Sequence, residues 1–147
     1  MAITTNAITN SFKEDLLQGT QVFAAGAGNT FKLALYTSAA TIGADTTSYA
    51  VGIAGQVGDT GTYVAGGGAL VTALVSVNGT TAFVDYNDLS FTGVTLTAAG
   101  ALIYNDTQAG DPSVCVLDFA GDKTATSGTF TIQFPDANDT QAIIRIS

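Results

Sequence analysis

The sequence contains no histidine and no tryptophan, and it has a single cysteine, Cys115. Without histidine, the usual group that activates a serine or cysteine nucleophile is missing, and one cysteine excludes an internal disulfide. Cys115 lies in an alternating apolar run, which is typical of a buried thiol. The remaining side chains offer no recognisable set of base, orienting group and oxyanion donor. The composition therefore predicts a protein that is not an enzyme and needs no cofactor.

Charged residues are also scarce. Four Lys and Arg stand against twelve Asp and Glu, so that only 11% of the 147 residues are charged and the net charge is −8, whereas about 25% is usual. The negative balance disfavours nucleic acid and anionic membranes as partners. We expect neither a secretion signal nor a membrane span, because long apolar runs are absent. So few charges suit a subunit whose faces are covered by neighbours; a small monomer with a Thr-rich surface is the alternative.

The N-terminal segment, residues 1–29, is expected to contain a short amphipathic helix at about residues 10–19. Ser11 followed three residues later by Glu14 fits a capping box, and Gly19 fits a C-terminal stop. The apolar stripe of this helix consists of Phe12, Leu16 and Leu17. A helix this short is stable only when docked. It either covers the domain's own sheet or acts as an arm that docks on a neighbouring subunit.

From residue 30 onward the apolar pattern has a period of two, so residues 30–147 are predicted to form a single β domain. About eight short strands separated by turn signals predict a mainly β fold, either an antiparallel β-sandwich or a partly open barrel. Among the predicted strands, "GALIYN" and "SVCVLDF" should be neighbours joined by the turn "DTQAGDP". The second of these has two apolar faces, with Cys115 on one and Val114 and Val116 on the other, so we expect it to be central and covered on both sides.

The strongest short-range signal is "VSVNGTTAFV". Asn78 and Gly79 predict a two-residue hairpin turn that places Val77 opposite Thr80. One face of this hairpin is predicted to be core, and the other is apolar enough to need partial cover. The large apolar residues on that second face are Leu70, Leu74 and Phe83.

A Gly-rich loop at residues 52–68 belongs to a long connection that starts near residue 37. Long connections in compact domains tend to be functional or mobile. No lysine follows the glycines, so this is not a phosphate-binding loop. The loop and the N-terminal segment are the expected contact elements, and the candidate interaction residues are Phe12, Leu16, Leu17, Tyr63, Leu70, Leu74 and Phe83.

Four aspartates near predicted turns are the candidates for a calcium site: Asp106, Asp111, Asp118 and Asp122. Oxygen ligands from neighbouring turns are what Ca²⁺ prefers. Their spacing matches no EF-hand or aspartate-rich repeat, and Asp beside Gly or Pro is ordinary in turns. Turn stabilisation is therefore the preferred interpretation, and no metal is expected.

The order of several segments resembles a family of small virion proteins encoded by tailed bacteriophages, many of them from marine hosts. The resemblance spans almost the whole length and rests on "NSFKEDLLQG", "NTFKLALYTSAATIGADTTSY", "GTYVAGGGALV", "LTAAGALIYND", "CVLDFAGDKTATSGTFTIQFP" and "AIIRI". It implies a structural role in the virion, with synthesis in the host bacterial cytoplasm and without catalysis.

The compact β domain, without coiled-coil heptads or fibre repeats, favours a capsid decoration or cement protein. Its expected partners are the major capsid protein or other virion subunits, together with self-association. A tail, collar or head-fibre component is the structural alternative. A calcium-dependent carbohydrate-binding module that uses the turn aspartates is the alternative from another class.

Overall fold

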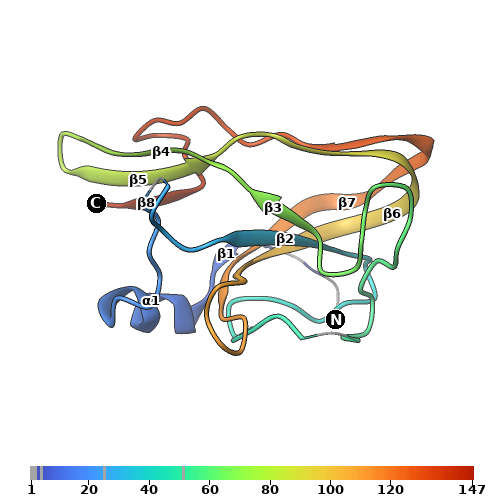
Figure 1. Ribbon diagram of the computed structural model, residues 1–147, viewed down its shortest axis with the longest axis horizontal. Coiled ribbons are helices and arrows are strands. Elements are labelled where there is room, and N and C mark those ends of the chain that lie inside the picture. Colours follow the sequence, from blue (N-terminus) through green and yellow to red (C-terminus); the bar gives the residue numbers. More distant parts are fainter. Residues whose placement is uncertain (1–2, 4, 25, 51) are drawn as a thin grey trace.

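The computed structural model describes residues 3, 5–24, 26–50 and 52–147. The fold is mainly β, with one short helix and two antiparallel sheets that form an open sandwich (Figure 1). The five-stranded sheet has the order β1-β7-β6-β2-β3, and the three-stranded sheet has the order β4-β5-β8. The strands are β1 (Ala7–Ile8), β2 (Phe31–Tyr36), β3 (Gly68–Leu70), β4 (Thr72–Asn78), β5 (Thr81–Tyr86), β6 (Leu89–Asn105), β7 (Ser113–Ile132) and β8 (Ile144–Ile146).

Two long strands, β6 and β7, lie side by side in the five-stranded sheet. The sequence pattern divides β6 and β7 into four shorter strands, but they form one hairpin of 17 and 20 residues. Irregularities in the β6–β7 ladder coincide with positive φ angles at Gly93, Ala120, Gly121 and Ser127. Extra residues are absorbed in these bulges, so the strands continue past them.

The predicted pairing of "GALIYN" with "SVCVLDF" is confirmed, with Ile103 opposite Cys115. Both faces of this part of β7 are covered, since Cys115 and Val116 belong to different buried clusters. Val114 was expected to share the Val116 face, which is wrong. A register shift near Tyr104 places Val114 in the same cluster as Cys115.

The β4–β5 hairpin forms as predicted, but its register differs by two residues. The turn residues are Gly79 and Thr80, so Val77 lies opposite Ala82 and not opposite Thr80. Gly79 has a φ of 56° at the first turn position, where a type II′ turn requires glycine. From Leu74 to the turn, the shift of two preserves which residues share a face. An irregularity between Thr72 and Leu74 changes the pairing beyond that point, so Tyr86 lies opposite Thr72.

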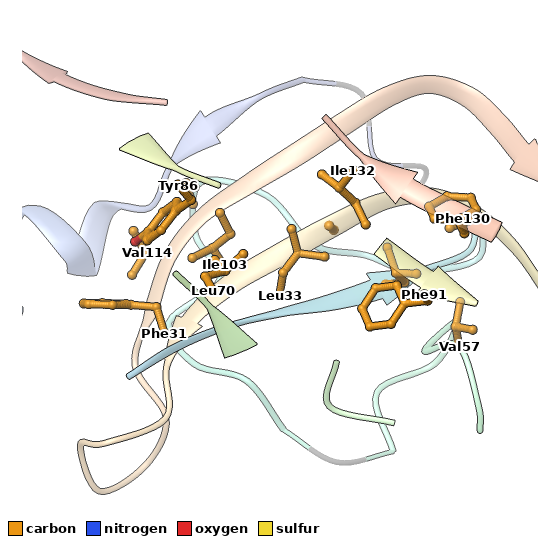
Figure 2. Close-up of a cluster of buried hydrophobic side chains, with 14 of the residues drawn as sticks. Phe31, Leu33, Val57, Leu70, Tyr86, Phe91, Ile103, Val114, Phe130 and Ile132 are labelled. Atoms are coloured by element: carbon orange, nitrogen blue, oxygen red, sulfur yellow. The ribbon is translucent and has the colours of Figure 1, made fainter. Parts of the chain in front are cut away.

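The main core lies between the two sheets (Figure 2). Phe31, Tyr86 and Val114 gather at one end of the close-up, and Phe91 and Phe130 at the other. These side chains come from both sheets, so the core joins the layers of the sandwich. Burial of such large side chains contributes about 1.5–3 kcal/mol each.

The opposite face of the five-stranded sheet is covered by the connection between β2 and β3, residues 37–67, through Ala40, Ile42, Tyr49 and Ile53. Val57 and Tyr63, from the Gly-rich part of this connection, pack into the main core instead. The ring of Tyr49 stacks on the ring of Tyr104, with centroids 4.4 Å apart. The Tyr104 hydroxyl donates to the carbonyl of Gly66 at 2.7 Å. The glycine loop is therefore packed on the protein's own sheet and is not a projecting arm.

The N-terminal segment is also built into the domain. β1 pairs with β7, and helix α1 (Asn10–Leu17) buries Phe12 in the main core. Thr9 is the N-cap residue and makes no capping hydrogen bond, so the expected capping box at Ser11 is wrong. Gly19 does end the helix as predicted, with a φ of 74°. The helix packs on its own domain through Phe12.

Candidate protein-binding surface

Large apolar side chains are exposed mainly at one end of the molecule, around β4, β8 and α1 (Figure 1). The most exposed is Leu17, the last residue of α1, at 90%. The others at this end are Val71, Leu74, Val75, Val77 and Ile146. Val22 and the loop residue Val64 are exposed elsewhere along the chain. Such grouping of apolar side chains at one end is typical of an interaction surface.

Strand register explains why Val75, Val77 and Ile146 share one face, whereas Leu74, opposite Asp85, lies on the other face of β4. Val77, Ala82 and Ile146 lie directly opposite one another across β4, β5 and β8, and all are exposed. The neighbouring row begins with Val75 and continues through Val84 to Ile144, which is buried in the main core. We call the exposed residues Val75, Val77, Ala82 and Ile146 the β4–β8 face. On the same face of the three-stranded sheet, Val84 and Ile144 are buried in the main core. The β4–β8 face extends this side of the sheet from the core to the surface.

A groove runs beside this face, between α1 and β8, with a volume of about 550 Å³. Its lining is largely apolar and includes the half-buried Leu16, the exposed Leu17 and both isoleucines of β8. Phe12 closes its floor and is only 2% exposed. Lys13 and Arg145 are the charged residues that line it. The groove has the character of a contact for another apolar surface.

The predicted interaction residues divide into two groups. Phe12, Tyr63, Leu70 and Phe83 are all buried, at 8% exposure or less, so they are core residues, although Phe12 also lines the groove. Tyr63 has an internal role instead, because its hydroxyl accepts a hydrogen bond from the backbone N–H of Leu35. Leu16, Leu17 and Leu74 remain at the surface. The structure thus places four of the seven predicted contact residues in the core, because an apolar pattern does not separate core from contact positions.

The four candidate aspartates do not converge. Asp106 pairs with Lys32 at 3.0 Å, and Asp111 has the left-handed φ of 48° that turn aspartates tolerate. Asp118 accepts a hydrogen bond from the N–H of Ala120 at 2.9 Å, several residues along β7 from that turn. Asp122 is exposed within β7 and does not end a strand. Among the described residues, no group of three or more His, Cys, Asp or Glu side chains is placed to hold a metal ion.

The groups with displaced acidities are core residues. Burial raises the pKa of the Cys115 thiol to about 12, so the thiol stays protonated at neutral pH. Burial also raises the pKa of Asp85, whose carboxylate is 0% exposed. Desolvation favours the neutral form of an acid. A protonated, buried thiol is a poor nucleophile.

Another hollow, about 510 Å³, lies along residues 41–48 of the long connection. Its lining consists mainly of threonines and small residues, with Asp45 as the charged group. Asp45 already accepts a hydrogen bond from the side chain of Asn10 at 2.8 Å. The one carboxylate of this hollow therefore already has a partner, and the lining is more polar than that of the groove between α1 and β8.

No protein-family model, curated protein or solved structure matches the chain. Within the described part of the chain, no helix is long and apolar enough to span a membrane. The exposed apolar surface around β4, β8 and α1 is the feature of the structure that indicates binding to another protein.

Sequence reasoning missed the exposed valines of β4 as contact residues. The signal was present, because residues 60–84 contain no Asp, Glu, Lys or Arg. An uncharged stretch that includes an exposed strand is unusual in a chain with a net charge of −8.

Proposed function

We propose that this chain is a non-enzymatic structural protein of a tailed-phage particle, which decorates the capsid by bridging neighbouring copies of the major capsid protein. The observation that carries this proposal is the β4–β8 face with its adjoining groove, an apolar surface at one end of a chain with few charges. Water contact with such side chains is unfavourable, and binding to another protein relieves it. The resemblance of the sequence segments to small virion proteins supplies the partner class.

A decoration role also agrees with the small size of the apolar surface. Decoration proteins occupy many equivalent sites, so modest contacts at each site sum over the shell. A single groove of about 550 Å³ beside a small apolar face is suited to such a modest contact. A tail or collar position would place the same surface against a different virion subunit, present in few copies.

The test has two parts. First, purified particles of the phage that encodes the chain are analysed by quantitative mass spectrometry. Hundreds of copies per particle support decoration, a dozen or fewer support a tail or collar position, and absence from the particle overturns the proposal.

Second, Leu17→Glu places a charge beside the groove, and Val64→Glu places the same charge at an exposed apolar residue of the 37–67 connection. Each variant is added to particles that lack the protein, and the bound amount is measured. We expect Leu17→Glu to bind at least tenfold more weakly and Val64→Glu to bind like the unmodified protein. Equal binding of both variants would show that the groove is not the contact.

A further inference from the structure

We propose that β4 is a dimerisation edge, which pairs antiparallel with β4 of a second copy of this chain and joins two three-stranded sheets into one of six strands. This inference concerns the backbone edge of β4 and does not require the virion role. It starts from the position of β4 at the end of the order β4-β5-β8, where β5 is its only pairing partner among the described strands.

The other edges of the two sheets are too short to serve as templates. β1 has two residues, and β3 and β8 have three each. Very short edge strands are a common way in which proteins prevent edge-to-edge pairing. β4 has seven residues, and Leu74–Asn78 pairs with β5 in unbroken register after a single irregularity near Thr72. β4 is therefore the edge that lacks this protection.

The open sides of the long β6–β7 hairpin are protected by other means. Thr92 and Thr95 of β6 donate their backbone N–H groups to the hydroxyls of Thr62 and Thr60 in the 37–67 connection, at 2.8 and 2.9 Å. On β7, Ala120 and Gly121 have positive φ angles that break the regular ladder. Bulges and covering loops are recognised protections of sheet edges. β4 has no charged side chain along its length. The connection after β7 reaches its last residue, where the Asn78 side-chain amide donates to the Asp139 carboxylate at 3.0 Å.

The charge distribution favours a second copy of this chain as the partner that pairs with β4. Two chains that each carry −8 repel one another over most of their surfaces. Residues 60–84 contain no charged side chain, and the Asp139 carboxylate contacts β4 at its last residue, Asn78. The middle of β4 therefore allows two identical chains to approach with few like charges facing one another. A basic partner would be attracted more strongly to the acidic parts of the surface than to this uncharged edge. The uncharged edge thus favours self-pairing.

A twofold axis through Ser76 gives a register in which each contact occurs twice, once from each copy. Opposed residues of an antiparallel pair share a face, so Ser76 would lie opposite Ser76 of the second copy. Val75 would then lie opposite Val77 of the second copy, and the apolar row would continue across the interface. Because each copy uses the same edge, the pairing is isologous and closes at the dimer.

The first experiment measures mass by sedimentation equilibrium on the full chain. The contact is small, so we expect a dissociation constant on the order of 1–100 µM and a species of twice 14.8 kDa at high concentration. Val77→Lys puts a charge on the edge strand at a side chain that is 65% exposed, and Val64→Lys is the control at 60%. Val77→Lys should weaken dimerisation at least tenfold, and Val64→Lys should leave it unchanged. A monomer at roughly 500 µM, or equal dimerisation of both variants, would overturn the inference.

The second experiment remains informative if Val77→Lys fails to fold. Ser76→Cys would form an intermolecular disulfide under mild oxidation, because paired side chains near the axis are about 4.5–5.5 Å apart at Cβ. Ser90→Cys, at an exposed serine of β6, is the control, and native Cys115 is buried. Covalent dimer should form for Ser76→Cys and not for Ser90→Cys. Equal cross-linking of both variants, or none for Ser76→Cys, would contradict the pairing.

The two proposals fail separately. A chain that binds particles but neither dimerises nor cross-links through β4 would leave the decoration role standing and exclude the edge pairing. A chain that dimerises through β4 but is absent from particles would do the reverse.

Discussion

The hydroxyl of Tyr63 accepts a hydrogen bond from the backbone N–H of Leu35 at 2.9 Å. The carbonyl of Leu35 in turn accepts from the N–H of Val57 at 3.0 Å. β3 pairs with β2 only as far as Leu33, so the long connection takes over the edge of β2 where β3 ends. Tyr63 thus stands in for a missing strand residue, which explains why it is 0% exposed.

The first prediction concerns this hydrogen bond. Tyr63→Phe removes the acceptor and leaves the buried N–H of Leu35 without its partner, so unfolding free energy should fall by about 1–3 kcal/mol. Tyr36→Phe is the matched control, because the Tyr36 hydroxyl is buried without a hydrogen-bond partner among the described residues. That change should be neutral or stabilising. Urea denaturation of both variants measures the difference, and equal losses would argue against the role of the bond.

The second prediction concerns Gly67. A Cβ atom at this position would lie 1.7 Å from the carbonyl oxygen of Leu33. Gly52 has the same φ of 83° but open space around it. Gly52→Ala should therefore cost only the backbone strain, about 1–2 kcal/mol, whereas Gly67→Ala also forces the loop away from β2. We expect the second loss to exceed the first by at least 2 kcal/mol, measured by thermal and urea unfolding.

The third prediction concerns Asp85 and pH. Burial and then the nearby charges of Asp136 and Asp88 raise its pKa in the folded protein, although the N–H of Tyr86 donates to it. In the unfolded chain the pKa is about 3.9, so the folded state binds the proton more tightly. Stability is therefore highest below the unfolded pKa and falls as pH rises through the folded pKa.

Asp85→Asn removes the titrating proton and should flatten this decline between acidic and neutral pH. Asp122→Asn is the control, with the same change of charge at an exposed position. Unfolding free energy is measured across the pH range for all three proteins. A decline of unchanged slope in Asp85→Asn would assign the pH dependence to other groups.

Strand identity and pairing were largely predictable from the sequence, because alternation and turn residues are local signals. The "GALIYN" and "SVCVLDF" pair and the stop at Gly19 are examples. The continuity of β6 and β7 was not predictable in this way. A glycine such as Gly121 marks a bulge or a turn equally well, and only the partner strand decides between them.

The candidate surface was harder to predict than the fold. Leu74 and Leu70 lie in the same alternating stretch, yet Leu74 is exposed and Leu70 is in the core. Their difference arises from sheet membership, because Leu70 belongs to β3 and Leu74 to β4. Sequence pattern carries no direct information on which sheet a strand joins, and so the contact residues were confused with core residues.

The pairing of β1 with β7 has a consequence for synthesis of the chain. Ala7 lies opposite Val116, so the strand that is made early has no partner until more than a hundred further residues have been added. At typical rates of about 5–20 residues per second, β1 and the apolar side of α1 wait on the order of 5 to 20 seconds. During that interval Phe12 is not yet buried, and the nascent chain exposes an apolar segment to solvent and to other proteins. A chaperone that binds short apolar segments would find the apolar side of α1 accessible during this interval.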